Sequence, residues 1–180
     1  MGFDELVAEG QAEPTAGWDF SWFEGRATEQ RPSWGYANQL GHRVARSTAV
    51  LDVQTGGGEV FGEVLDRVGP PAVVAATESW APNVARARNR LRPFGAEVAE
   101  VADEAVLPFP SARFDLVASR HPTVVIWDEI AQVLRSGGSY FSQQVGSGSN
   151  RELTDFMLGP QPVSGRRPDS SGWPPPAGEG

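Results

Sequence analysis

The sequence predicts an α/β fold with three layers, in which a mostly parallel sheet carries helices on both faces. Between residues 36 and 145, short apolar runs alternate with segments whose apolar residues recur every three or four positions. Glycines and prolines separate these segments. Strands that alternate with helices in this way indicate parallel strands joined by crossover helices.

The regular pattern begins after an aromatic-rich segment, residues 1–35, which we interpret as a lid or cap. A short helix is expected from about residue 36 to residue 45, and a buried strand over Ala49–Val53. The helix that follows ends at Gly69-Pro70-Pro71. Its apolar residues, which recur with helical spacing, are Val60, Phe61, Val64, Leu65 and Val68.

The strand–helix unit then recurs. Pro82 suits the first turn of the next helix, and Gly137-Gly138 separates the last helix from the last strand. The expected ranges are Ala72–Thr77, Glu97–Val101, Phe114–Ser119 and Ser139–Val145 for strands, and about 82–91 and 125–134 for helices.

After the fifth strand the composition changes. Arg151–Leu158 is expected to form a short helix, and the Pro-, Gly- and Ser-rich segment beyond it cannot bury enough apolar surface to offset the entropy of ordering it. We therefore expect a folded domain over residues 36–146, and a short helix with a disordered tail over residues 147–180.

Composition narrows the chemistry that this chain can perform. The 180 residues include no cysteine and no lysine, which excludes thiol nucleophiles, cysteine-bound clusters and Schiff-base catalysis. A net charge of −8 disfavours nucleic acid as a partner, and no apolar run approaches the roughly 18 residues of a membrane span. His42 and His121, without a carboxylate cluster, do not indicate a metal site. We expect a cytoplasmic protein that binds neither nucleic acid nor membrane.

The sharpest motif is the segment Asp52–Gly58, which joins the first strand to the next helix. An acid at a strand end, followed by a glycine-rich turn at a helix N-terminus, is typical of a site where backbone N–H groups face a nucleoside-bearing ligand. The glycine spacing differs from the GxGxxG of dinucleotide-binding folds, and a P-loop would need a lysine. A glycine-rich turn that binds no ligand is the alternative.

This segment resembles the first motif of class I S-adenosylmethionine (SAM)-dependent methyltransferases, in which three alternating glycines follow an acid. Asp52 matches the acid, Gly56 and Gly58 match the second and third glycines, and Gln54 stands in place of the first. The resemblance implies a Rossmann-like domain that binds SAM through these four residues. Glutamine at such a turn implies either a strained backbone, at a cost of about 1–3 kcal/mol, or a shifted loop.

Later residues extend the resemblance. Glu78, directly after the second strand, matches the acid that accepts hydrogen bonds from the ribose hydroxyls, and Asp103 matches the acid that binds the adenine amino group. The runs Leu107–Pro110 and Phe114–Val117 and the turn Leu134–Gly138 resemble the stretches that lead into the fourth and fifth strands of these enzymes. The alternative for Glu78 is a helix-capping or surface role, and the alternative for Asp103 is an acid of the loop without a ligand. The pattern is most similar to the small-molecule branch that includes quinone-biosynthesis methyltransferases.

Two residues after the fourth strand, Arg120 and His121, are the candidate catalytic groups. Methyl transfer from a sulfonium depends mainly on positioning and desolvation, and a base helps where the acceptor must lose a proton. We interpret His121 as that base and Arg120 as the group that holds an acidic acceptor; a cleft-lining histidine and a surface ion pair are the alternatives. Trp34 and Tyr36 are expected to form a wall of the acceptor pocket, or else to pack against the sheet.

The leading interpretation is a SAM-dependent methyltransferase that acts on a small molecule. The family has seven strands where this pattern predicts five, so we expect a sheet that is incomplete at its C-terminal edge, truncated after the fifth strand and able to self-associate through that strand. The alternative is a non-catalytic, degenerate methyltransferase-like domain with a binding or interaction role. A nicotinamide-dependent oxidoreductase is a third possibility, which the glycine spacing disfavours.

Overall fold

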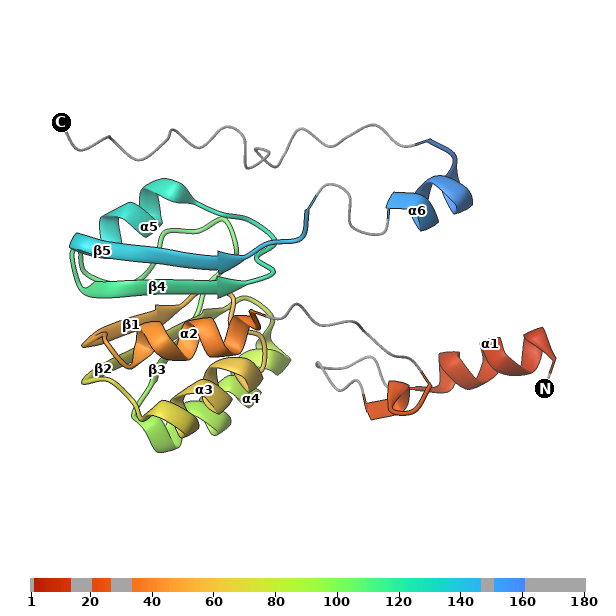
Figure 1. Cartoon of the computed structure of the whole chain (residues 1–180), viewed down its shortest axis with the longest axis horizontal. Helices are drawn as coiled ribbons and strands as arrows, with labels where there is room; N and C mark the ends of the chain where they lie inside the picture. The colour runs from red at the N-terminus through yellow and green to blue at the C-terminus, as the bar shows by residue number, and fades with distance from the viewer. Residues whose placement is uncertain (1, 14–20, 27–33, 147–150, 161–180) are drawn as a thin grey trace. The chain divides into compact units, whose positions relative to one another are not determined.

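The computed structural model describes residues 2–13, 21–26, 34–146 and 151–160. The chain divides into two units, residues 1–143 and 144–180. In the first unit, five strands form one parallel sheet in the order β3-β2-β1-β4-β5 (Figure 1). The strands are β1 (Ala49–Asp52), β2 (Val73–Glu78), β3 (Glu97–Glu100), β4 (Phe114–Arg120) and β5 (Leu134–Gln143). The helices are α1 (Phe3–Ala12), α2 (Tyr36–Val44), α3 (Glu59–Val68), α4 (Ala81–Leu91) and α5 (Trp127–Val133), with 3-10 turns η1 (Ser21–Phe23) and η2 (Arg92–Phe94).

The predicted α/β fold is confirmed, and most elements lie close to the expected ranges. The start of β5 differs: the strand begins at Leu134, where a helix was expected to end. Phe114 of β4 pairs with Leu134, but Leu116 pairs with Ser139, so the residues around Gly137 bulge out of the pairing. Gly137 has a φ of 77°, which suits such a bulge.

Helices cover both faces of the sheet (Figure 1). Neighbouring residues on a strand point to opposite faces, so Val50 and Leu116 pack with α2, α3 and α4, whereas Leu51 and Val117 pack with α5. All four side chains are almost completely buried. The central strands are therefore held from both faces, and their carboxyl ends stay together at one edge of the sheet.

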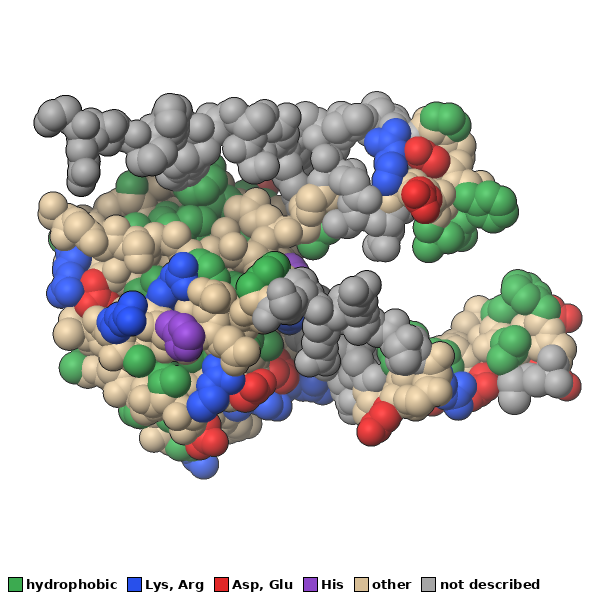
Figure 2. Space-filling model, in the orientation of Figure 1, with side chains coloured by type: hydrophobic (Ala, Val, Ile, Leu, Met, Phe, Trp, Pro, Cys, Tyr) green, Lys and Arg blue, Asp and Glu red, His purple; other side chains and the backbone are tan. Residues whose placement is uncertain are grey.

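Helix α1 is an element that the sequence analysis missed, because residues 1–35 were interpreted as an irregular lid. Phe3, Leu6 and Val7 have helical spacing and are exposed. Figure 2 shows hydrophobic side chains on the surface of this helix. The predicted lid lies partly outside the described residues, and the predicted disordered tail lies outside them beyond residue 160.

The second unit contains helix α6, which spans Arg151–Leu158 as expected. Several of its apolar side chains, among them Phe156 and Met157, are exposed (Figure 2). Within the described residues, none of the helices has the length and apolar content that crossing a bilayer requires.

Strand β5 forms one edge of the sheet, and among the described strands only β4 pairs with it. An edge strand offers unpaired backbone groups to another chain. Self-association through β5 stays a prediction, which light scattering of the purified chain would test.

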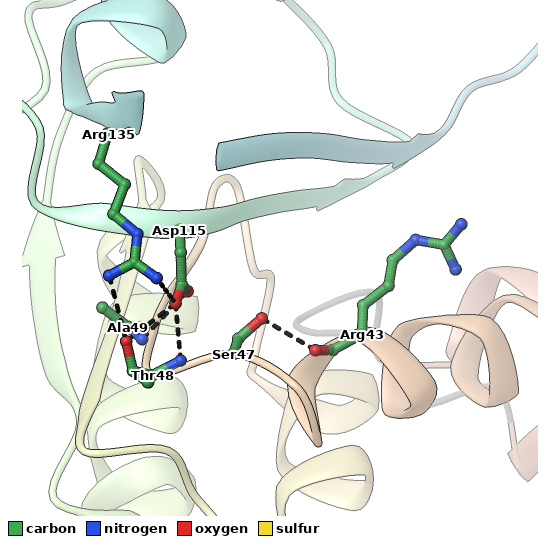
Figure 3. A network of polar contacts seen from close by, with 6 residues as sticks. All are labelled: Arg43, Ser47, Thr48, Ala49, Asp115 and Arg135. Carbon is green, nitrogen blue, oxygen red and sulfur yellow. Dashed lines mark hydrogen bonds and ion pairs between the residues drawn. The ribbon is translucent and has the colours of Figure 1, made fainter. Parts of the chain in front are cut away.

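A polar network at the amino-terminal ends of β1 and β4 centres on Asp115 (Figure 3). Its carboxylate accepts hydrogen bonds from the N–H groups of Thr48 (2.8 Å) and Ala49 (3.1 Å) and pairs with Arg135 at 2.7 Å. Burial opposes ionisation, but these donors together lower the pKa of Asp115 below its usual value. The network thus fixes the starts of β1 and β5 against β4.

Replacing Asp115 with alanine should lower the free energy of unfolding at pH 7 by about 1.5–3 kcal/mol, the range for hydrogen bonds to a charged group. Because the folded-state pKa lies below the unfolded value, this stabilisation is complete above the unfolded pKa and is lost as the pH falls through the folded one. Urea unfolding of both proteins, from pH 7 to the lowest pH at which they fold, measures the difference. A difference that does not shrink with acid would contradict the role of the charge.

Candidate functional site

The carboxyl ends of β1, β2 and β4 surround a cavity of about 340 Å³, together with parts of α2 and α3. Ligand pockets span roughly 300–1,000 Å³, so this cavity can hold a small molecule. Most of the residues that were predicted to form the site line it, namely Tyr36, Asp52, Gln54, Gly56, Glu78, Asp103, Arg120 and His121. The structure thus brings them together, while their individual roles stay predictions.

Gly58 and Trp34 are not among the residues that line the cavity. A Cβ atom on Gly58 would lie 3.1 Å from Leu91 Cγ and 3.4 Å from Ala87 Cα, and Gly58 has a φ of 76°. Only glycine accepts both conditions, so Gly58 allows α3 to pack closely against α4. Trp34 is 48% exposed, and Tyr36 is the residue of this pair that faces the cavity.

The glycine-rich loop is held by the end of β2. The N–H of Gln54 donates to the hydroxyl of Thr77 at 3.2 Å, and the N–H of Gly56 donates to Glu78 Oε2 at 2.8 Å. Gln54 has a φ of 58°, in the left-handed region that favours glycine. Of the two outcomes expected for glutamine at this position, the strained backbone is the one observed.

Glu78 is buried and uses both of its oxygens. Oε2 accepts from Gly56, and Oε1 accepts from the N–H of Trp80 at 3.0 Å. Each carboxylate oxygen can accept two hydrogen bonds, so each retains one acceptor site, and Glu78 lines the cavity. Two neighbouring hydroxyl groups of a ligand would suit this arrangement.

Asp52 lies at the end of β1 and accepts a 2.6 Å hydrogen bond from the hydroxyl of Thr55. Burial raises the pKa of Asp52 to about 7; the bond from Thr55 opposes this rise, and the nearby charge of Glu78 adds to it. Near neutral pH this carboxyl is therefore poised between its two protonation states. A cation in the cavity would favour the charged form.

Two buried polar atoms at the cavity make no hydrogen bond: the hydroxyl of Tyr36 and Oδ1 of Asn83. The two residues are 6% and 4% exposed, and leaving such a group unpaired costs about 1–3 kcal/mol. Burial, followed by the charge of Asp52, raises the pKa of Tyr36 above its usual range, so its hydroxyl remains a neutral donor. One unpaired donor and one unpaired acceptor are what a polar ligand would satisfy.

Arg120 is the last residue of β4 and His121 follows it, and both line the cavity. The N–H of His121 donates to the carbonyl of Gln143 at 2.7 Å, and Arg120 Nε lies 3.2 Å from Gln143 Oε1. His121 has a φ of 53°, so it is a second residue of the site with a strained backbone. Strand β5 thereby positions both candidate catalytic residues.

The charges around the cavity are mostly negative. Asp52, Glu59, Glu78 and Asp103 line it, and among the described lining residues Arg120 carries the permanent positive charge. A cavity lined by one sign of charge attracts ligands of the opposite sign. The site is therefore suited to a ligand that carries positive charge.

The sequence analysis assigned no role to several polar residues of the site, among them Thr55, Thr77, Asn83 and Thr123. Thr77 lies at the carboxyl end of a predicted strand, and this position is the signal that could have identified it. Thr55 bonds to Asp52 at the end of β1, Asn83 lies in α4 with an unpaired oxygen, and Thr123 bonds to Asp103 in a different loop.

The comparisons with known proteins agree with this architecture. Residues 50–138 match the model of a family described as a methyltransferase domain. The PH0226 protein from Pyrococcus horikoshii OT3 superimposes with a TM-score of 0.58 at 18% identity, over 86% of this chain and 72% of that one. Residues 50–138 are thus similar to a methyltransferase domain, and the chain has a Rossmann-like α/β fold similar to that of the PH0226 protein.

Two further solved structures are similar. A provisionally assigned sarcosine dimethylglycine methyltransferase from Galdieria sulphuraria has a TM-score of 0.51 at 16% identity, over 67% of this chain and 51% of that one. A SAM-dependent methyltransferase from Aquifex aeolicus has a TM-score of 0.47 at 16% identity, over 66% and 68% of the two chains. The chain spans about half the length of the Galdieria protein. No curated protein matches it.

The raised pKa of Asp52 predicts how the stability depends on pH. Between its ordinary value near 4 and about 7, the folded protein holds a proton that the unfolded chain has lost, so stability falls as the pH rises, by at most about 1.4 kcal/mol per pH unit. Asp52→Asn removes this titration and keeps an acceptor for Thr55. In urea unfolding, the free energy of unfolding of the variant should rise relative to that of the wild type from pH 5 to pH 8.

The matched control for this experiment is Asp66→Asn, which makes the same change at an exposed position of α3. It should leave the pH dependence of the wild type unchanged. Parallel curves for Asp52→Asn and the wild type would contradict the assignment of the titration to Asp52.

Proposed function

We propose that this domain binds SAM in the cavity and transfers the methyl group to a small-molecule acceptor. The observation that carries the proposal is the pair of buried carboxylates, Asp52 and Glu78, at the carboxyl ends of the neighbouring strands β1 and β2. Ligands of open α/β sheets bind outside the carboxyl ends of the strands. The predominantly acidic lining favours a cofactor that carries a sulfonium and an ammonium group.

Each part of the cofactor has a candidate partner in the cavity. The remaining acceptor sites of Glu78 suit the two ribose hydroxyls, and Asp103 is the candidate for the adenine amino group. The turn at Gln54 and Gly56 would lie beneath the methionine portion. The unpaired atoms of Tyr36 and Asn83 offer one further donor and one further acceptor.

Arg120 and His121 form the acceptor side of the proposal. SAM, when bound, supplies a methyl group that is activated by a positively charged sulfur. His121 would take the proton from an acceptor hydroxyl or amine, and Arg120 would hold an acidic group of the acceptor. Strand β5 holds both residues through Gln143, which keeps them at the cavity.

Calorimetric titration with S-adenosylhomocysteine tests the cofactor site, with NAD as the control ligand. The wild type should bind S-adenosylhomocysteine with micromolar affinity and should not bind NAD. Glu78→Gln should weaken binding by about tenfold or more, because it weakens the acceptor for the ribose hydroxyls. Glu63→Gln, the same change at an exposed position of α3, should bind like the wild type. A folded wild type that binds neither ligand would contradict the proposal.

The acceptor side is tested by screening small molecules for S-adenosylhomocysteine release. For any acceptor that the screen identifies, His121→Ala should lower turnover by about 10²-fold or more, the range for general-base catalysis, while its affinity for S-adenosylhomocysteine stays within about twofold. Cofactor binding without release on any acceptor would favour the alternative, a non-catalytic binding domain.

A further inference from the structure

The side chain of Gln54 connects two loops that are far apart in the sequence. Its Oε1 accepts from the N–H of Thr123 at 2.7 Å, and its Nε2 donates to the carbonyl of Val124 at 2.8 Å. Both ends of the amide are therefore used, and the glycine-rich loop is attached to the segment between β4 and α5. A glycine at position 54 could make neither bond.

Thr123 continues this connection to a third loop. Its hydroxyl lies 2.6 Å from Asp103 Oδ2 and 3.1 Å from Gln54 Oε1. The hydroxyl has one proton, which goes to the nearer, charged oxygen of Asp103. Thr123 is thus bonded to Gln54 through its backbone and to Asp103 through its side chain.

The backbone conformation of Gln54 indicates that its side chain has a structural role. Its φ of 58° is strained for a residue other than glycine, and such strain persists where the surroundings hold the residue in place. The hydroxyl of Thr77 holds its N–H, while Thr123 and Val124 hold its side chain. The strain at position 54 therefore accompanies an amide whose oxygen and nitrogen are both hydrogen-bonded.

We propose that Gln54 is a positioning residue, whose amide holds the segment at 123–124 and, through Thr123, orients the Asp103 carboxylate toward the amino group of a bound aminopurine. The inference rests on the proposed function, because the aminopurine concerned is the adenine of SAM. Gln54 and Asp103 line the same cavity, so the chain of contacts runs along its wall. Gln54 then contributes to base selectivity from the position where the family pattern has glycine.

Hydrogen exchange tests the connection without any ligand. Gln54→Gly should speed exchange of the Thr123 amide by about tenfold, because the amide loses its acceptor. The matched control is Ala112→Gly: Ala112 has a similar φ of 55°, and its N–H donates to Gln132, away from the cavity. Glycine relieves the backbone at both positions, so only Gln54→Gly should alter Thr123. Unchanged exchange in Gln54→Gly would overturn the connection.

Base selectivity is measured with S-adenosylhomocysteine and S-inosylhomocysteine, whose base has a carbonyl in place of the amino group. The wild type should bind S-adenosylhomocysteine with the lower Kd. Gln54→Gly should reduce the ratio of the Kd for S-inosylhomocysteine to the Kd for S-adenosylhomocysteine by about threefold to tenfold. Thr123→Val should reduce this ratio equally, because it removes the hydrogen bond to Asp103. Exchange of the backbone amide at position 123 should stay slow in this variant, because its bond to Gln54 is kept. Ala112→Gly should leave the ratio unchanged.

The ratio of the two Kd values distinguishes a positioning role of Gln54 from a general loss of structure, because a loss of structure would weaken the binding of both ligands equally. If the wild type prefers S-adenosylhomocysteine and both variants keep the wild-type ratio, the inference is overturned and the proposed function stands. If the wild type binds neither ligand, the proposed function fails and the role in base selectivity fails with it; the Thr123 exchange rate still decides whether Gln54 holds the segment.

Discussion

The whole site depends on one turn, in which the chain leaves β1 at Asp52 and enters α3 at Glu59. Strand β1 lies between β2 and β4, so the turn at its carboxyl end has the carboxyl ends of these two strands on either side. Two groups of β2 fix it, since Thr77 holds the N–H of Gln54 and Glu78 holds the N–H of Gly56. The glycine-rich loop and the acid after the second strand, which are separate motifs in the sequence, are therefore one structural unit.

The same geometry places two buried carboxyl groups, those of Asp52 and Glu78, near each other. Burial and the charge of Glu78 raise the pKa of Asp52, while Tyr36 and Asn83 each leave a polar atom unpaired. These features lower the stability of the fold without a ligand, and binding sites commonly retain such costs because they are recovered on binding. A positively charged ligand with several polar groups would relieve all of them.

The sequence predicted the elements well because each has its own apolar periodicity. It predicted Asp52, Glu78 and Asp103 because each ends or follows a predicted strand and matches an acid of the methyltransferase pattern. It did not predict where β5 begins, since the bulge at Gly137 depends on pairing with β4. It also did not predict that Thr123 lies against Gln54, because the two are separated by 69 residues. A polar side chain in a loop has no periodicity, and its role becomes visible only with its partner.

Gln54 shows how such a partner changes an interpretation. In the sequence, Gln54 stands where the family motif has a glycine, and this difference in a cofactor-binding loop favours the interpretation of a degenerate domain. In the structure the backbone keeps the left-handed conformation that glycine would adopt, so the turn itself is preserved. The added side chain bonds to the loop that follows β4 and, through Thr123, reaches Asp103 in the loop that follows β3. The substitution therefore adds hydrogen bonds among three cavity-lining loops while it retains the path of the chain, and this combination does not support a loss of the binding site.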